Sequence, residues 1–242
     1  MEQLSVVIPV YNEQKILVKN TEKLMRFLES KKYKYEIILS DNGSTDNTYP
    51  LSKKLEKKHP DKIKAISIQK RGVGAAFRNA LKKSSYNKVI SLDMDLSTDL
   101  GFVPMCLDEL KRSSVVIGTK KESQKRPVIR KIISKPYIMM TNLLLGMRFS
   151  DYSIGAKGYR KSDIIDFSKY LDDDSFYVVE LIHLSNKSGK RISEIAIRCH
   201  DNRESKFNLF NEVIYRFRKL LALRMFGTRA DNTTNIPITD MN

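Results

Sequence analysis

Strand-like and helix-like segments alternate along the first 120 residues, and this alternation constrains the fold more than any other feature of the sequence. Short apolar runs rich in β-favouring residues are followed by segments whose apolar residues recur at helical spacing. The strand-like runs cover residues 4–8, 35–40, 63–68, 88–92 and 114–118, and the helix-like segments cover 16–28, 48–58, 72–83 and 102–112. Such a βαβ order predicts an α/β fold with a mostly parallel sheet and helices on both of its faces.

The second half of the chain is patterned differently. A basic run at 120–135 contains seven Lys or Arg residues and one acidic residue, and we interpret it as a loop that becomes ordered when it binds phosphate. An apolar helical segment follows, which should begin or bend near Pro136. Further strands are expected at 156–159 and 191–198, and helices at 176–185 and 209–226. No linker or internal repeat interrupts the pattern, so we predict one domain over residues 1–227 and a polar tail at 228–242.

Three acidic motifs directly follow strand-like runs. They are Ile8-Pro9-Val10-Tyr11-Asn12-Glu13, Asp41-Asn42-Gly43-Ser44-Thr45-Asp46 and Asp93-Met94-Asp95-Leu96-Ser97. Parallel strands bring their carboxyl ends to one edge of a sheet, which is where α/β folds bind ligands. We therefore expect the three motifs to converge, and their acidity indicates a site for a metal ion and a nucleotide.

Asp93 and Asp95 lie two residues apart at an expected strand end. There, both carboxylates can approach one hard cation such as Mg²⁺ or Mn²⁺. Such an ion would offset the charge that develops on a diphosphate leaving group. The simpler interpretation is a solvated strand end, because charged chains contain this pattern by chance. The position after a buried-looking strand favours the metal site.

Two other acidic residues fit a nucleotide. The carboxylate of Asp41 can accept the imino N–H of a pyrimidine or guanine base. The alternative is turn chemistry, with Thr45 or Asp46 capping the next helix. Glu13 can bind ribose hydroxyls, or it can sit in the first turn of a helix, where the helix dipole favours a carboxylate.

A glycine-containing segment, Arg71-Gly72-Val73-Gly74-Ala75-Ala76, opens the third helix-like region. It allows a phosphate to approach the backbone closely, with Arg71 and Arg78 as candidate diphosphate contacts. Tight packing of helix against sheet is the alternative. The segment matches neither the dinucleotide-binding fingerprint nor the P-loop, which excludes both of those classes.

The net charge of +16, from 44 basic and 28 acidic residues, indicates an anionic partner. Nucleic acid, an anionic membrane surface and a phosphorylated substrate all fit. Cys106 and Cys199 lack metal-ligand spacing and favour a reducing, intracellular location. We find no signal peptide pattern and no run of about 18 apolar residues. We therefore expect a cytoplasmic protein, peripheral on the cytoplasmic face of a membrane.

In this order, the motifs resemble those of the family-2 glycosyltransferases with a GT-A fold, and most of all the polyprenyl-phosphate sugar transferases, such as dolichol-phosphate mannose or glucose synthases. The resemblance covers residues 5 to about 207 and includes 151–160, 179–195 and Glu204-Ser205-Lys206. Four positions depart from the family pattern, where Asp, Gln, Phe and Gly are usual: Asn42, Ser97, Ala156 and Arg203.

The resemblance implies a fold, a reaction and a set of residues. A sugar would pass with inversion from a GDP- or UDP-sugar to a polyprenyl (dolichyl) phosphate, with Mg²⁺ or Mn²⁺ as cofactor. The implied nucleotide-binding residues are Pro9, Tyr11, Glu13, Asp41, Arg71 and Met94, and the metal ligands are Asp93 and Asp95, of which Asp95 is also catalytic. The implied acceptor-phosphate residues are Lys120, Arg130, Ser134, Arg203, Ser205 and Lys206.

The acceptor decides whether a general base is needed. A lipid phosphate is already an anion near neutral pH, since its second pKa is about 6. A sugar hydroxyl, as in a soluble family-2 enzyme of glycan assembly, would need a carboxylate base. Asp151 and Glu180 are the candidates for that catalytic role, although both fit a structural role as well.

The basic amphipathic helix at 209–226 also has two interpretations. Its apolar stripe contains Phe210, Val213, Ile214, Phe217, Leu220 and Leu221. The stripe can lie in a membrane interface or cover the protein's own core. Many relatives carry membrane spans that this chain lacks, so a small membrane-anchoring subunit is a further candidate partner.

A nucleotidyltransferase and a non-enzymatic basic module are weaker alternatives to a glycosyltransferase. We expect no nucleic-acid partner, because acidic strand ends repel phosphate unless a metal intervenes.

Overall fold

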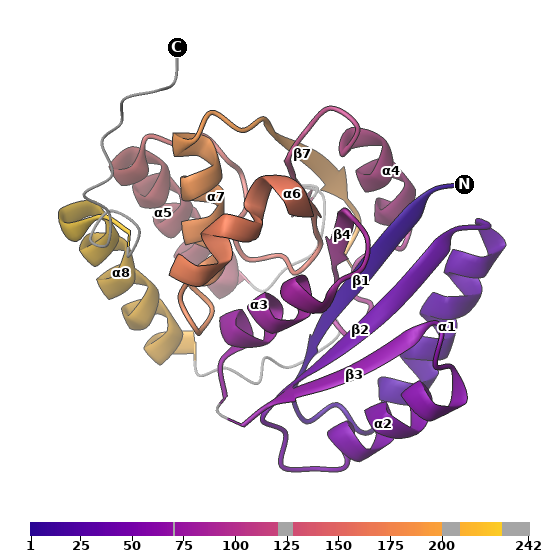
Figure 1. Cartoon of the computed structure of the whole chain (residues 1–242). Helices are drawn as coiled ribbons and strands as arrows, with labels where there is room; N and C mark the ends of the chain where they lie inside the picture. The colour runs from indigo at the N-terminus through magenta and orange to yellow at the C-terminus, as the bar shows by residue number, and fades with distance from the viewer. Residues whose placement is uncertain (70, 121–127, 200–208, 229–242) are drawn as a thin grey trace.

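A seven-stranded sheet forms the centre of the computed structural model, which describes residues 1–69, 71–120, 128–199 and 209–228 (Figure 1). The strands are β1 (Gln3–Val10), β2 (Lys34–Asn42), β3 (Ile63–Ile68), β4 (Lys88–Ser91), β5 (Val115–Lys120), β6 (Lys157–Arg160) and β7 (Ile192–Ile197). Their order across the sheet is β3-β2-β1-β4-β6-β5-β7. Within the described sheet, β6 runs antiparallel to β4 and β5, and the other pairs are parallel. The predicted α/β fold with a mostly parallel sheet is confirmed.

Helices cover both faces of the sheet. The described helices are α1 (Leu17–Ser30), α2 (Thr48–Lys58), α3 (Val73–Lys83), α4 (Phe102–Glu109), α5 (Val128–Leu145), α6 (Lys161–Ile164), α7 (Tyr177–Lys187) and α8 (Leu209–Phe226), with a 3-10 helix at Ile165–Tyr170. One core lies between the sheet and α1, α2 and α4, and a second lies between the sheet and α3, α5, α7 and α8. β1 serves both, because strand side chains alternate: Val6 and Ile8 enter the first core and Val7 the second.

The expected elements mostly lie where the sequence pattern placed them, and α8 has the expected bounds. The basic run differs from its interpretation as a loop, because α5 begins at Val128 and includes the end of that run. Pro136 lies inside α5 rather than at its start. The apolar residues at 128, 129, 132 and 133 already follow helical spacing, which explains the earlier start. None of the described helices is long and apolar enough to cross a membrane.

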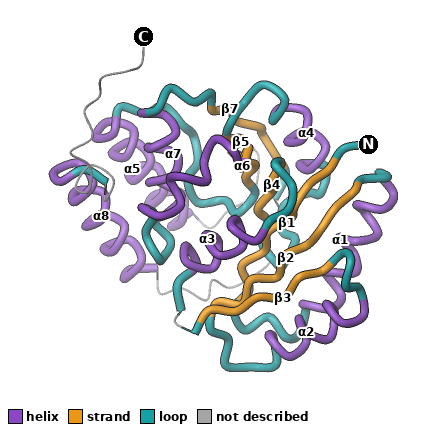
Figure 2. The backbone as a smooth tube through the Cα atoms, viewed as in Figure 1, coloured by secondary structure: helices purple, strands orange, loops and turns teal. Residues whose placement is uncertain are grey.

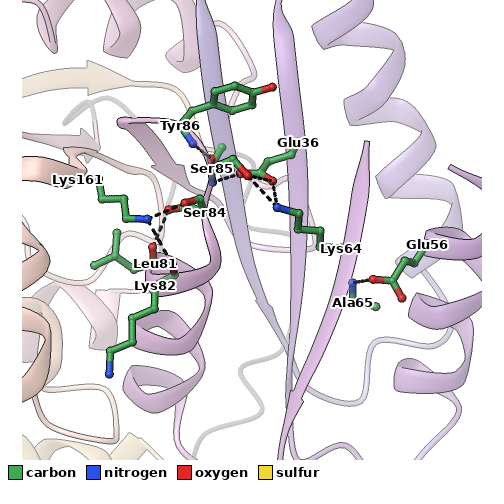
Figure 3. A network of polar contacts seen from close by, with 11 residues as sticks. Glu36, Glu56, Lys64, Ala65, Leu81, Lys82, Ser84, Ser85, Tyr86 and Lys161 are labelled. Carbon is green, nitrogen blue, oxygen red and sulfur yellow. Dashed lines mark hydrogen bonds and ion pairs between the residues drawn. The ribbon is translucent and has the colours of Figure 1, made fainter. Parts of the chain in front are cut away.

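A buried carboxylate connects the amino-terminal ends of four strands (Figure 3). Glu36 on β2 accepts a hydrogen bond from Ser5 Oγ of β1 at 2.6 Å and from the backbone N–H of Ser85, just before β4. Lys64 Nζ of β3 lies 2.6 Å from the same carboxylate. Burial acts to raise the pKa of Glu36, but the hydrogen bonds from Lys64, Ser5 and Ser85 outweigh it and hold the pKa below its usual value. Glu36 is therefore ionised and fully hydrogen-bonded.

We predict that Glu36→Gln lowers the free energy of unfolding at pH 7 by about 2 kcal/mol, because buried donors lose their charged acceptor. The pKa of Glu36 is lower in the folded state than the value of about 4.3 in the unfolded chain. Its contribution is therefore present above that pH and is lost as the pH falls through the folded pKa. In urea unfolding, the difference between wild type and variant should shrink below about pH 4.

Glu22→Gln is the matched control, because Glu22 meets Lys58 at 3.5 Å on the surface. Such exposed pairs contribute about 0 to 1 kcal/mol. Equal losses in the two variants at pH 7 would contradict the assigned role of Glu36.

Candidate active site

The three acidic motifs lie at one edge of the sheet. β1 is parallel to β2 and β4, with Val10 opposite Asp41 and Val7 opposite Ser91. The chain therefore leaves all three strands at their common carboxyl edge, where ligands bind in folds of this kind. Figure 2 shows the loops that follow β1 and β2 beside these strand ends.

Hydrogen bonds join the loop after β1 to the loop after β2. The backbone N–H of Asn12 donates to Ser44 Oγ at 3.0 Å, and the N–H of Thr45 donates to Asn12 Oδ1 at 2.8 Å. The N–H of Glu13 donates to Thr48 Oγ1 at 2.7 Å. Asn12 has a φ of 52°, a left-handed conformation that asparagine tolerates better than most residues. Side-chain to backbone hydrogen bonds therefore hold the two loops against each other.

Asp41 lies at the end of β2 and is 2% exposed. Its Oδ2 atom accepts hydrogen bonds from the N–H of Ser44 at 3.3 Å and from Ser67 Oγ at 3.0 Å. Its Oδ1 atom has no hydrogen-bond partner among the residues that the structure describes. A buried oxygen without a donor is costly, so this atom suits a donor supplied by a ligand. Oδ2 thus stabilises the turn, and Oδ1 can accept a hydrogen bond from a base.

Two more of the predicted nucleotide-binding residues lie against each other. The guanidinium carbon of Arg71 is 4.2 Å from the ring centroid of Tyr11, which is a cation–π contact. Next to them, Asn42 Oδ1 accepts a hydrogen bond from the N–H of Gly72 at 2.5 Å. Asn42, where the family usually has Asp, therefore connects the end of β2 to the start of α3. Pro9 is the penultimate residue of β1 and precedes Tyr11 by two positions.

Of the two interpretations of the glycines that open α3, close packing fits this structure and an approaching phosphate does not. A Cβ on Gly74 would lie 2.2 Å from the carbonyl oxygen of Asp172, and one on Gly72 would lie 2.8 Å from that of Asp173. Arg78, a candidate diphosphate contact, instead donates to the carbonyl oxygen of Asp172 at 3.1 Å and pairs with the carboxylate of Asp173. A segment about a hundred residues away occupies the place that the local pattern offered to phosphate.

The third motif follows β4. Asp93 is exposed and Asp95 is partly exposed, whereas the side chain of Met94 is buried in the core. Only the backbone of Met94 is thus left for its predicted nucleotide contact. Asp95 Oδ1 accepts a hydrogen bond from the N–H of Ser97 at 2.9 Å. A Cβ on Gly155 would lie 2.2 Å from a carboxylate oxygen of Asp93, so glycine is required for this close approach.

The acidic pair offers two ligands that suit a divalent cation. Carboxylate oxygens from Asp93 and Asp95 are the hard ligands that Mg²⁺ and Mn²⁺ prefer. The described part of the chain contains no group of three or more His, Cys, Asp or Glu residues that could hold an ion. A cation at this pair would therefore take its other ligands from a bound diphosphate and water, as Mg²⁺ commonly does.

The two candidate general bases both make structural hydrogen bonds. Asp151 is buried in the loop before β6, and its Oδ1 atom accepts from the N–H of Ser153 at 2.6 Å and from Ser153 Oγ at 2.8 Å. Glu180 is buried in α7, and its Oε2 atom accepts from the N–H of Asp172. Their catalytic role stays a prediction.

Lys157 is a buried cation near this site that the motifs did not reveal. It begins β6, is 1% exposed, and its ammonium group donates to the carbonyl oxygen of Ile154. Burial lowers the pKa of Lys157 to about 8, and the negative charges of Asp151 and Asp93 act in the opposite direction. The ammonium group is thus within electrostatic reach of both carboxylates. Its only signal in the sequence was a lysine inside an otherwise apolar strand.

The predicted acceptor-phosphate residues fall where the structure does not describe side chains. The backbone places Lys120 at the end of β5, and Arg130 and Ser134 near the start of α5. Outside the described residues lie Arg203, Ser205 and Lys206. Their contacts with an acceptor stay predictions.

Known proteins share this sequence pattern and fold. The model of the family "Glycosyl transferase family 2" matches residues 5–167. An undecaprenyl-phosphate 4-deoxy-4-formamido-L-arabinose transferase of Proteus mirabilis (strain HI4320) is 27% identical over 224 residues, which are 92% of this chain and 66% of that protein. The protein with this name from Salmonella choleraesuis (strain SC-B67) is also 27% identical, over 92% of this chain and 65% of its own length. The chain thus spans slightly less than two thirds of these relatives.

Solved structures share the fold at lower identity. Glucosyl-3-phosphoglycerate synthase from Mycobacterium tuberculosis, in complex with Mn²⁺, uridine diphosphate and glucosyl-3-phosphoglycerate, has a TM-score of 0.67 at 16% identity. The match covers 92% of this chain and 80% of that one. The complex of that enzyme with uridine diphosphate alone has a TM-score of 0.64 at 18% identity, over 92% of this chain and 79% of the other.

We predict that Gly155→Ala weakens binding of Mn²⁺ in the presence of uridine diphosphate by about tenfold or more, the scale seen when support of a metal ligand is lost. The added Cβ would displace the carboxylate of Asp93. Isothermal titration calorimetry measures the effect. Gly189→Ala is the control, because its φ of 65° strains any side chain while the surrounding space is open. That variant should lose about 1 kcal/mol of stability and keep its Mn²⁺ affinity; unchanged affinity in Gly155→Ala would refute the assignment.

Proposed function

The chain belongs to glycosyl transferase family 2, and on this premise we propose that it transfers a sugar from a nucleoside diphosphate sugar to a polyprenyl phosphate. The observation that carries the proposal is the buried Oδ1 atom of Asp41, which has no partner among the described residues. It lies at the same edge of the sheet as Asp93 and Asp95. A base at Asp41 and a diphosphate near the acidic pair would together span this edge.

We propose uracil as the base. Asp41 Oδ2 already accepts hydrogen bonds from Ser44 and Ser67, which leaves Oδ1 for a ligand. Uracil offers one imino N–H between two carbonyl groups and so suits a single acceptor atom. Guanine offers an imino N–H beside an amino group and would best engage both oxygens of a carboxylate, and cytosine has no imino hydrogen. The contact of Arg71 with Tyr11 provides a surface on which a base can stack.

The diphosphate would bind beside the acidic pair. Asp93 and Asp95 would hold Mg²⁺ or Mn²⁺, and such an ion, when bound, stabilises the negative charge of a departing diphosphate. Asp95 is kept in place by its hydrogen bond from Ser97, and Gly155 lets Asp93 sit close to the loop before β6. The ammonium group of Lys157 offsets part of the negative charge of Asp93. The acceptor would then displace the diphosphate directly, which inverts the sugar's anomeric centre.

A lipid phosphate is the acceptor that best fits these residues and the names of the relatives. Its oxygen is anionic near neutral pH, because the second pKa of a phosphate is about 6, so no general base is required. This agrees with the structural hydrogen bonds that Asp151 and Glu180 already make. Cations must hold the phosphate instead, and Arg130 and Lys206 are the proposed contacts, with Lys120, Ser134, Arg203 and Ser205 near them in the sequence pattern.

The acceptor would reach the site from a membrane surface. Leu220 and Leu223 of α8 are buried, so part of its apolar stripe covers the core. Other large apolar side chains of α5 and α8 are exposed, with Leu143 at 79% and Met225 at 70%. We call the exposed set the apolar patch, and it consists of Met139, Leu143, Ile214, Leu221, Met225 and Phe226. The same two helices carry exposed basic side chains at Lys135 and Arg224, as expected for contact with anionic lipid.

We predict that UDP with Mn²⁺ raises the free energy of unfolding by about 2.7 kcal/mol at a hundred times its Kd, and that EDTA removes the effect. GDP and CDP should bind more weakly than UDP.

Asp41→Ala should lose about tenfold or more in UDP affinity, because a charged acceptor is removed. Ser67→Ala removes one of the two hydrogen bonds to Oδ2 and should reduce the difference in affinity between UDP and GDP. Tighter binding of GDP by the wild type would contradict the base assignment, and no binding of any nucleoside diphosphate would contradict the function.

We predict that Arg130→Ala and Lys206→Ala each abolish transfer of sugar to polyprenyl phosphate in vesicles and leave UDP affinity unchanged. The measurement is radiolabelled sugar recovered in extracted lipid, beside a UDP titration. Lys125→Ala is the control from the same basic run, and it should retain transfer. Loss of UDP binding in both variants would argue against an acceptor role, and a labelled product without lipid would favour a glycan hydroxyl as acceptor.

A further inference from the structure

Residues 171–175, which we call the acidic turn, connect the 3-10 helix to α7 and lie between α3 and α8. The turn contains three consecutive aspartates, Asp172 to Asp174. Asp172 is only 4% exposed although it carries a carboxylate. Buried carboxylates are stable only when other groups satisfy them, and the partners of this one come from two separate parts of the fold.

On one side, the acidic turn is bound to α3. The N–H of Ala75 donates to the carbonyl oxygen of Asp173 at 2.9 Å. Arg78 donates to the carbonyl oxygen of Asp172 at 3.1 Å and pairs with the carboxylate of Asp173. Gly74 lets the two backbones meet, since any Cβ there would lie 2.2 Å from the carbonyl oxygen of Asp172. The first turn of α3 therefore cannot shift without moving the acidic turn.

The first turn of α3 also adjoins the residues proposed to bind the nucleotide of the donor. The N–H of Gly72 donates to Asn42 Oδ1, and Asn42 directly follows Asp41. Arg71 stacks on Tyr11. The backbone at 71–72 thus connects the acidic turn to the groups proposed to bind the base.

On the other side, the acidic turn is bound to α8. Lys219 Nζ lies 2.7 Å from Asp172 Oδ2, and the hydroxyl of Tyr215 donates to Asp172 Oδ1. The hydroxyl of Ser175 donates to the carboxylate of Glu212. Burial acts to raise the pKa of Asp172, but the hydrogen bonds from Lys219 and Tyr215 outweigh it and keep the pKa below its usual value. The link from α8 is therefore a charged one.

We propose that Asp172 is a positioning residue, through which the seating of α8 by Lys219 and Tyr215 holds the backbone at 71–72 in the conformation that binds the donor. The proposal rests on the proposed function in naming the ligand as a nucleoside diphosphate. The contacts themselves join α8 to α3 whatever that ligand is.

The apolar patch connects the position of α8 to membrane binding. It combines residues of α5 with residues of α8, and the two helices meet where the rings of Tyr137 and Phe217 pack edge to face at 5.5 Å. The patch is complete only when α8 is seated, so a bilayer that binds the patch stabilises the seated state. When two ligands both bind the same state of a protein more tightly, the binding of one raises the affinity of the protein for the other. Anionic vesicles should therefore tighten UDP binding, and UDP should tighten vesicle binding.

The first test is hydrogen–deuterium exchange of the full chain without nucleotide. Lys219→Met and Tyr215→Phe should speed exchange in the peptide that contains the amides of Gly72 and Ala75. Lys219→Arg keeps the charge and should restore slow exchange. Glu36→Gln is the control for general destabilisation, because its carboxylate lies at the opposite ends of the strands. If Glu36→Gln speeds exchange at this peptide as much as Lys219→Met does, the link is overturned.

The second test measures UDP affinity with Mn²⁺, with and without vesicles of phosphatidylglycerol and phosphatidylcholine. Lys219→Met should weaken UDP binding about tenfold and lose the gain from vesicles, within the usual range of coupling between sites. Arg218→Met, which removes the same charge from an exposed position of α8, should keep wild-type UDP affinity without vesicles. Wild-type affinity in Lys219→Met, or an equal loss in Arg218→Met, would overturn the proposal.

The two tests separate the two proposals. If the wild type binds no nucleoside diphosphate, the proposed function fails, and the exchange of Gly72 and Ala75 still decides whether α8 positions the start of α3. If UDP binds but neither the exchange nor the affinity responds to Lys219→Met, the function stands and the link fails.

Discussion

The parallel pairing of β1 with β2 and β4 is the interaction on which the whole site depends. Its backbone hydrogen bonds fix Val10 beside Asp41 and Val7 beside Ser91. Three motifs spread over ninety residues therefore end at one edge. The loop hydrogen bonds from Asn12 and Glu13 then only refine positions that the sheet has already set. Because this framework holds Asp41 in place, its side chain can remain buried with one oxygen that has no hydrogen-bond donor among the described residues.

The antiparallel strand β6 brings the rest of the site to that edge. Its first residue, Lys157, lies opposite Ser91 at the end of β4. A strand that ran parallel to β4 would begin at the far edge of the sheet, so only a reversed strand places Gly155 and Asp151 beside Asp93. The reversal also explains how Lys157 becomes a buried counter-charge for Asp93, which follows β4.

The sequence predicted those parts of the structure that depend on local pattern. The βαβ order, the bounds of α8 and the position of Asp41 at a strand end all follow from periodicity and position. The contacts of Gly72, Gly74 and Arg78 could not be predicted, because their partners lie about a hundred residues away and no local spacing encodes them. The start of α5 at Val128 was not predicted, because the charges of the basic run indicate a solvated loop although its apolar residues follow helical spacing.

The position of β6 between β4 and β5 also sets an order in which the sheet can form. β1 to β4 pair only with each other on their side of the sheet, so they can assemble from the first ninety or so residues. Among the described strands, β5 pairs with β6 and β7 alone, and both come later in the chain. During synthesis, β5 must therefore wait as an apolar segment without a partner until β6 has left the ribosome, and such waiting segments are prone to aggregate. The half of the fold that carries Asp41 would form first. The folding of the half that carries α8 would depend most on chaperones.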